Sequence, residues 1–141
     1  AEKWAVEIGG GTNHRFGLYD MVILKDNHID FAGGVTKALR STKSYLEKSK
    51  KKLKIEIEVR SLQELKEVIK EGGVERIMRD NMIPSQIRQG IAMIDGKYET
   101  EASGGITEMT ISEIADTGVD YISVGALTHS YKSLDMSLKA I

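Results

Sequence analysis

The chain has 141 residues, no cysteine, and 20 basic against 21 acidic side chains, which gives a formal net charge of −1. This composition excludes disulfide bonds and thiol catalysis, and the balanced charge argues against nucleic acid or an anionic membrane surface as a partner. The length suits one hydrophobic core, so we expect a single domain over residues 1–141. We expect neither a membrane span nor a signal peptide, and a cytoplasmic location.

Short apolar or alternating runs predict β-strands that are separated by helical segments. A charged helix is expected over Val35–Lys50, and Ala1–Ile8 has the pattern of the end of a helix. Alternating strands and helices predict parallel βα units. A βα unit takes roughly 30 residues and a closed eight-stranded barrel about 250, so we predict an α/β fold with an open or incomplete barrel of about five strands. The expected strands are Met21–Leu24, Ile55–Val59, Arg76–Met78, Tyr98–Ala102 and Tyr121–Val124.

Polar or small residues follow every predicted strand. In parallel α/β folds the carboxyl ends of the strands are where ligands bind. Strand ends also meet water, so the pattern by itself leaves a binding site and a solvated edge as alternatives. The residues at these ends are Lys25, Glu58, Asp80, the Ser103-Gly104-Gly105 bend and the Gly125-Ala126 bend.

Two predicted strands carry acidic residues on one face. Glu56 and Glu58 alternate with aliphatic residues in the second strand, and Glu99 and Glu101 share a face of the fourth. A half-exposed strand would look the same. The helical segments between the strands predict, however, a sheet that is covered on both faces. The glutamates then lie inside, where they need a cation, a hydroxyl-rich ligand or basic partners.

Glycine-rich stretches offer candidate anion sites. We expect the Ser103-Gly104-Gly105 bend to lead into a helix and, with Gly125-Ala126, to bind a phosphate group, although glycine turns are common without any ligand. His14 and Arg15 follow three glycines and could bind a carboxylate, the alternative being a flexible loop with a solvated arginine. His28 and His129 are interpreted as hydrogen-bonded loop residues.

Several blocks together resemble the quinolinate phosphoribosyltransferase family, in its C-terminal barrel part. They are GGGTNHRFGLYDMVILKDNHI, IEIEV, MRDNM, EASGGI and TGVDYISVGALTHS, in the order that the family has them. The resemblance implies phosphoribosyl transfer from phosphoribosyl pyrophosphate to quinolinate with decarboxylation, which gives nicotinate mononucleotide for NAD synthesis. It also implies Mg²⁺ as cofactor and a homodimer or higher oligomer that shares active sites.

The resemblance also assigns roles to individual residues. Lys25, Glu58 and Asp80 would be catalytic, with Glu58 and Asp80 facing the ribose and the Mg²⁺-pyrophosphate. His14, Arg15 and Lys25 would bind the quinolinate carboxylates. The 5-phosphate would be held by Ser103, Gly104, Gly105, Gly125 and Ala126.

The chain departs from the family in two respects. It corresponds to about half a subunit and lacks the Thr-Arg-Lys-Thr stretch, so the resemblance implies that the isolated chain is inactive. Arg79 also stands where the family has an aliphatic residue, on a strand face that should pack against helices; it would be destabilising if buried and harmless if exposed. The alternatives are a non-catalytic half-barrel that binds at most phosphate or a phosphosugar, and an aldolase-like lyase with Lys25 as Schiff-base residue.

Overall fold

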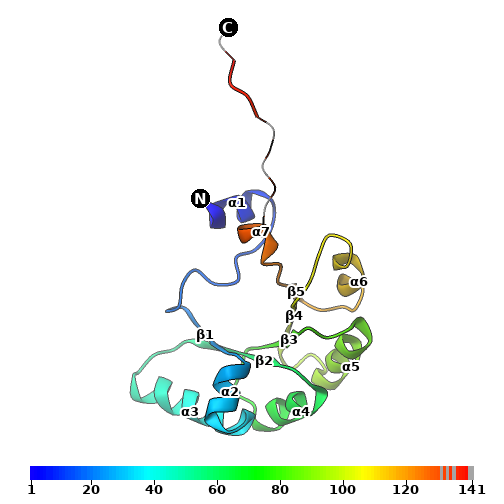
Figure 1. The fold of residues 1–141 in the computed structure, drawn as a ribbon. Helices are drawn as coiled ribbons and strands as arrows, with labels where there is room; N and C mark the ends of the chain where they lie inside the picture. The colour runs from blue at the N-terminus through cyan, green and yellow to red at the C-terminus, as the bar shows by residue number, and fades with distance from the viewer. Residues whose placement is uncertain (131, 133, 135, 140–141) are drawn as a thin grey trace.

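The computed structural model describes residues 1–130, 132, 134 and 136–139. Within them, five parallel strands form one sheet in chain order. Figure 1 shows this sheet curved and open at both ends, which confirms the predicted partial α/β barrel. The strands are β1 (Met21–Leu24), β2 (Lys54–Val59), β3 (Arg76–Asp80), β4 (Glu99–Ser103) and β5 (Tyr121–Ile122).

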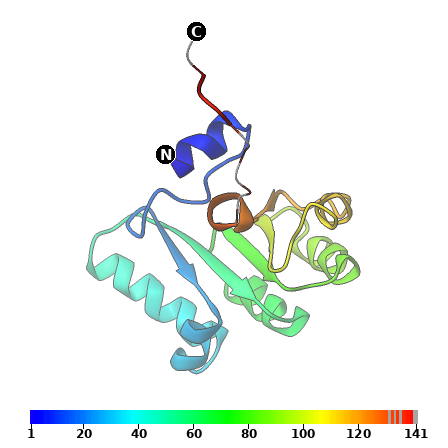
Figure 2. The same ribbon diagram turned by 45° about the horizontal axis from the view of Figure 1, so that its top comes forward.

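Helices cover mainly one side of the sheet. Helices α2 to α6 lie along its convex side, whereas α1 and α7 lie next to each other on the other side (Figures 1 and 2). None of the helices in the described part of the chain is long and apolar enough to cross a membrane. The helices are α1 (Glu2–Ile8), α2 (Asp26–Ala32), α3 (Val35–Lys48), α4 (Leu62–Glu71), α5 (Pro84–Ile94), α6 (Ile111–Ala115) and α7 (Ala126–His129).

Local sequence signals account for the beginnings of helices α4 and α5. The Ser61 hydroxyl accepts a hydrogen bond from the backbone N–H of Glu64 at 3.1 Å and so caps α4. Pro84 begins α5, where its missing N–H costs nothing. Helix α2 was not predicted, because its seven residues are too few to establish a helical period beside a strand.

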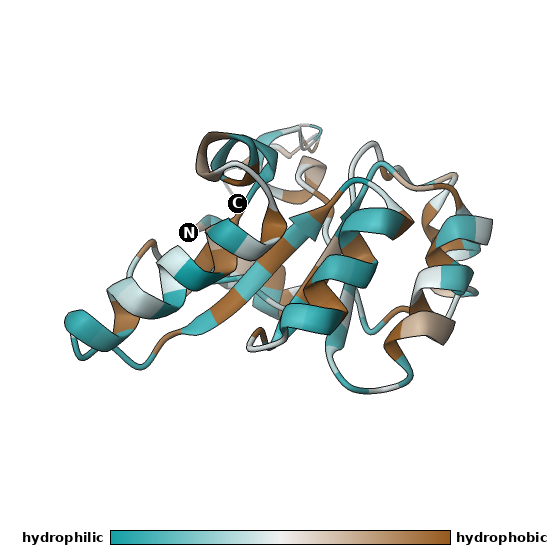
Figure 3. Cartoon of the chain, turned by 90° about the horizontal axis from the view of Figure 1, so that it is seen from below, coloured by the Kyte–Doolittle hydropathy of each residue, from teal (hydrophilic) through white to brown (hydrophobic). Residues whose placement is uncertain are grey.

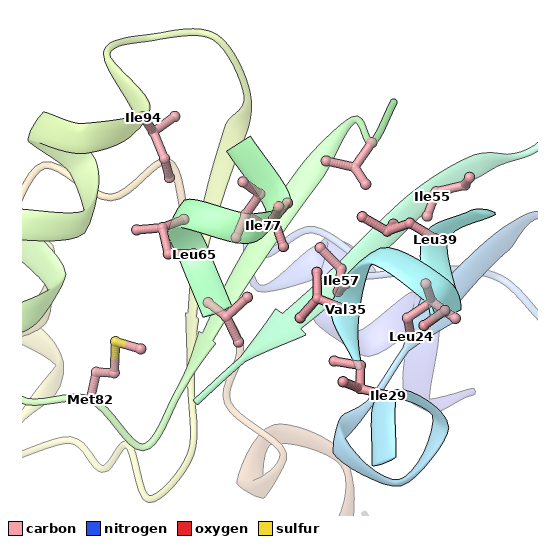
Figure 4. Packing of buried hydrophobic residues seen from close by; sticks show 14 of the residues in the cluster. Leu24, Ile29, Val35, Leu39, Ile55, Ile57, Leu65, Ile77, Met82 and Ile94 are labelled. Carbon is pink, nitrogen blue, oxygen red and sulfur yellow. The ribbon is translucent and has the colours of Figure 1, made fainter. Parts of the chain in front are cut away.

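The hydrophobic core lies between the sheet and the convex-side helices. Apolar residues of the strands alternate with polar ones, and those facing the helices are fully buried, as Ile57, Val59 and Ile77 show with 0% exposure. Leu39 of α3 and Leu65 of α4 pack against them (Figure 4). Each such side chain contributes about 1.5–3 kcal/mol by leaving water. Figure 3 shows the same alternation of polar and apolar residues along the strands.

Parallel pairing in register places the acidic residues on the opposite, concave face. In the sheet, Glu56 lies beside Arg76, which in turn lies beside Glu99. Two residues further along the strands, Glu58 lies beside Met78. Paired residues of neighbouring strands point to the same side of a sheet. The glutamates of β2 therefore lie inside the curve of the sheet and both are buried, whereas the prediction that helices cover both faces alike is wrong, since α2 to α6 all lie on the convex side.

Arg79 points the other way, into the apolar core. Its side chain has 0% exposure, and none of its three guanidinium nitrogens has a hydrogen-bond partner within the described residues. Gly90 of α5 leaves it room, since a Cβ there would lie 3.0 Å from Nη1. Burial lowers the pKa of Arg79 to about 10, against the opposing effect of Asp120. Of the two expectations for Arg79, the structure confirms that the side chain is buried. The alternative, that it is exposed and harmless, is wrong.

We expect Arg79→Met to raise the free energy of unfolding by about 1–4 kcal/mol, because an apolar side chain would replace a buried, unpaired charge. Urea denaturation of the chain measures the change. Arg88→Met, which removes an exposed arginine from α5, serves as the control and should have little effect. A destabilised Arg79→Met protein would show that the guanidinium has a partner.

Candidate active site

Three predicted residues meet at the carboxyl ends of neighbouring strands. Lys25 follows β1 and precedes α2, Glu58 is the next-to-last residue of β2, and Asp80 ends β3. Burial raises the pKa of Glu58, the charge of Asp80 raises it further, and Lys25 opposes them. The three side chains therefore lie within electrostatic reach of one another, with Lys25 exposed and Glu58 only 7% exposed.

Asn81 joins Asp80 to the first glycine bend. Its side-chain amide donates to the Asp80 carboxylate, and its backbone N–H donates to the carbonyl of Ser103 at 2.9 Å. Gly104 lies so close to Asn81 that a Cβ on Gly104 would be 2.8 Å from the backbone nitrogen of Asn81. Sequence reasoning gave Asn81 no role, although an asparagine after a strand end tolerates the left-handed backbone found here, with φ 52°.

The two small-residue bends are not helix N-termini of the expected kind. After Gly105 the chain runs through a loop before α6 begins at Ile111, so the prediction that the bend leads into a helix is wrong. Gly125 precedes α7, which has only four residues. Any anion at these bends would therefore meet backbone N–H groups rather than the dipole of a long helix.

His129 lies over the second bend. A Cβ on Gly125 would be 2.6 Å from its Nε2, and its Nδ1 lies 2.7 Å from the Ser130 hydroxyl. The interpretation as a hydrogen-bonded loop residue is confirmed as to the hydrogen bond but wrong as to the loop, because His129 is the last residue of α7, and it missed this closeness to Gly125. His28 lies in the first turn of α2 rather than in a loop, and its Nδ1 accepts the backbone N–H of Lys25 at 2.9 Å.

His14 lies on the concave face of the sheet rather than at its rim. Its Nε2 is 2.9 Å from a carboxylate oxygen of Glu56 and 3.4 Å from one of Glu101. The guanidinium of Arg15 instead points to the beginning of β1, where Nη1 donates to the carbonyl of Met21 at 3.4 Å. The structure thus does not bring Arg15 together with Lys25.

Arg76 completes the ion-pair cluster on this face. Its Nη1 donates to Glu101 at 2.9 Å, its Nε and Nη2 donate to Glu99 at 3.1 and 3.0 Å, and its guanidinium lies 3.9 Å from the ring centre of Tyr121. The Ser123 hydroxyl donates to the second oxygen of Glu101. His14 and Arg76 are the basic partners that the buried glutamates were expected to need.

The cluster shifts the pKa values of its members strongly. The close contacts of Nε2 with the carboxylates of Glu101 and Glu56 raise the pKa of His14 to about 9. Burial acts to raise the pKa of Glu101, but His14 and Ser123 outweigh it and lower that pKa to about 2. Burial raises the pKa of Glu56.

The ligand atoms of His14, Glu56 and Glu101 lie within 4.8 Å of one another, a spacing that would suit a cation. The imidazole proton and Arg76 already neutralise these carboxylates. We therefore assign the group as an ion-pair cluster.

The open parallel α/β sheet, with a lysine, two carboxylates and glycine bends at its strand ends, is the arrangement of part of an α/β barrel. The chain belongs to the quinolinate phosphoribosyltransferase family, since the family model described as "Quinolinate phosphoribosyl transferase, C-terminal domain" matches residues 1–139.

Named relatives agree with this assignment. Quinolinate phosphoribosyltransferase [decarboxylating] 2, mitochondrial, from Nicotiana glauca is 49% identical over 98% of this chain and 43% of its own length. The probable nicotinate-nucleotide pyrophosphorylase [carboxylating] of Bacillus subtilis is 43% identical over 97% of the chain and 46% of its own length. The crystal structure of NadC from Streptococcus pyogenes superposes with a TM-score of 0.89 and 46% identity, over 99% of this chain and 47% of that one. The chain spans about half the length of these relatives.

We expect the His14 ion pairs to stabilise the fold in a pH-dependent way. Because the folded pKa of about 9 exceeds the ordinary value of 6.5, the contribution is complete below about pH 6.5 and is lost as the pH rises through about 9. Urea denaturation of the chain and of His14→Gln at several pH values should show a stability difference that shrinks over this range. A difference independent of pH would contradict the assignment.

We expect Gly104→Ala to destabilise the chain by more than Gly105→Ala. Both glycines have positive φ values, 91° and 62°, so each alanine costs about 1–2 kcal/mol of backbone strain. Only at Gly104 would the new Cβ also collide with Asn81, whereas nothing lies within 4 Å at Gly105. Thermal unfolding of both variants measures the difference, and equal losses would mean that Asn81 moves aside without cost.

Proposed function

We propose that the chain supplies the C-terminal half of an active site that transfers a phosphoribosyl group to quinolinate and removes a carboxylate as carbon dioxide. Family membership supports this activity, as do the printed names of the relatives. The observation that carries the proposal is the meeting of Lys25, Glu58 and Asp80 at one edge of the sheet.

The proposed reaction makes two bonds and breaks two. The ring nitrogen of quinolinate attacks C1 of the ribose, and the bond from C1 to the pyrophosphate oxygen breaks. The bond from the ring to the neighbouring carboxylate then breaks, carbon dioxide leaves, and the electron pair left on the ring carbon takes up a proton. The products are nicotinate mononucleotide, pyrophosphate and carbon dioxide.

The carboxylates suit the sugar side of this reaction. Ribosyl transfer passes through a state with positive charge at C1, which nearby carboxylates such as Glu58 stabilise. Glu58 and Asp80 would also hold Mg²⁺, because carboxylate oxygens are the ligands it prefers and two neighbouring carboxylates repel each other without a cation. The ion would neutralise the leaving pyrophosphate.

The remaining roles are divided between the phosphate and the aromatic acid. Backbone N–H groups at Ser103, Gly104 and Gly105, together with Gly125 and Ala126, would hold the 5-phosphate. Lys25 and His14 would bind the quinolinate carboxylates. Arg15 would have to move from its present contact with Met21 to join them.

One alternative is that the chain belongs to this family but does not take part in catalysis. The chain covers 43–47% of its relatives, so a half-barrel that only binds phosphate or a phosphosugar remains the competing function. A Schiff-base role for Lys25 is not supported, since this side chain is exposed, whereas a nucleophilic lysine is activated by desolvation or a neighbouring cation.

We propose further that the protein is a homodimer. Helix α1 has no buried residue, and its Trp4 and Ile8 are 69% and 71% exposed, so a further surface is needed to cover them. The cytoplasmic location stays a prediction, and plant relatives carry mitochondrial or chloroplastic names.

The activity can be tested by grafting. We expect a chimera in which this chain replaces the matching part of the Bacillus subtilis relative to form nicotinate mononucleotide from quinolinate and phosphoribosyl pyrophosphate with Mg²⁺, and the chain alone to form none. Product is measured by chromatography. A folded, dimeric chimera without turnover would favour the non-catalytic alternative.

Within the active chimera, Lys25→Ala and Asp80→Ala should each lower turnover by about 10²-fold or more, because each removes a charge that stabilises the transition state. Lys37→Ala, in the exterior helix α3, is the control and should retain full activity. Near-normal rates in the Lys25 and Asp80 variants would remove those residues from the mechanism.

A further inference from the structure

His14 contacts carboxylates of two strands that are not neighbours in the sheet. Glu56 belongs to β2 and Glu101 to β4, and β3 runs between them. The curvature of the sheet turns both carboxylates toward one imidazole nitrogen, at 2.9 and 3.4 Å. Their side chains are 0% and 1% exposed, whereas that of His14 is 26% exposed.

The two carboxylates differ in their other partners. Glu101 is held from two further sides, by Arg76 of β3 and by Ser123 after β5. Glu56 has only His14 as an ionic partner among the described residues, and no hydrogen bond of good geometry reaches its oxygens. A neutral His14 would leave Glu56 as a buried carboxylate without an ion-pair partner, because Arg76 acts on it only through electrostatics over a longer distance, and this is costly.

The charged groups around His14 favour its cationic form. Glu56 and Glu101 face it directly, and Glu99 lies behind Arg76 in the same cluster. Arg76, the nearest cation of the cluster, is engaged by Glu99 and Glu101.

The second ring nitrogen of His14 faces a different environment. Within the residues that the structure describes, Nδ1 has no recorded hydrogen bond, and the ring is partly open to solvent. A protonated imidazole donates from both nitrogens, so an N–H at this position would be available to an external acceptor.

We propose that Glu56 and Glu101 are positioning residues that hold His14 as a fixed imidazolium, with Nε2 toward the sheet and Nδ1–H available to a carboxylate ligand. His14 then acts as a constant positive charge and not as a general acid or base. Its use on a substrate carboxylate rests on the proposed function, whereas its charge and orientation belong to this chain and can be measured on it.

The test is a proton titration of the three histidine rings in the ¹⁵N-labelled chain by NMR, with the His14 signals identified by their loss in His14→Gln. We expect both nitrogens of His14 to carry protons at neutral pH and to titrate near pH 9. A single protonated nitrogen at neutral pH, or a midpoint near the ordinary 6.5, would overturn the proposal.

The carboxylates are tested by Glu56→Gln, with Glu47→Gln on the exposed face of α3 as the matched control. We expect the Glu56 variant to lower the His14 midpoint by at least about one pH unit, a tenfold loss of proton affinity, and the control to leave it unchanged. Equal midpoints in the two variants would overturn the role of Glu56. The titration of the unmodified chain decides the charge of His14 even if Glu56→Gln does not fold.

The active chimera separates this inference from the proposed function. In the unmodified chimera, the KM for quinolinate should stay constant up to about pH 8.5 and rise above it. In the Glu56→Gln chimera the rise in KM should begin at a lower pH, and kcat should change less than KM. A KM unaffected by Glu56→Gln would overturn the use of His14 on the substrate. An inactive chimera would contradict the proposed function and leave the measured charge of His14 as it stands.

Discussion

Buried carboxylates on the concave face need counter-charges, and this requirement governs how the other parts of the chain are placed. Glu56 and Glu101 are nearly inaccessible to water, and an ionised carboxylate in that position must have a counter-charge. His14 and Arg76 supply it. Because His14 belongs to the loop before β1, the same ion pairs also attach the N-terminal segment to the sheet.

In-register parallel pairing distributes the remaining roles. The period of two along a strand sends Ile57 and Ile77 into the core and Glu56 and Arg76 to the concave face, and it leaves the last polar residues at the rim. Arg79 is the exception, a charged residue at a core position. The edge of the sheet that carries Lys25, Glu58 and Asp80 thus rests on a core that an unpaired charge interrupts at one place, next to α5.

Much of this arrangement could be predicted from local pattern. The strands were found to within one or two residues, and the inward glutamates followed from alternation. Helix α2 and the loop before α6 were not found, since short segments carry too little periodicity. The meeting of Asn81 with Gly104 was also missed, because it joins two loops that are distant in the chain.

Local periodicity and motifs along the chain were enough to identify the family, the order of the βα units and the residue types at each strand end. That His14 meets Glu56 and Glu101 while Arg15 turns toward Met21 became visible only in the folded chain. An ion pair across non-adjacent strands depends on the curvature of the whole sheet, which no short stretch of sequence encodes.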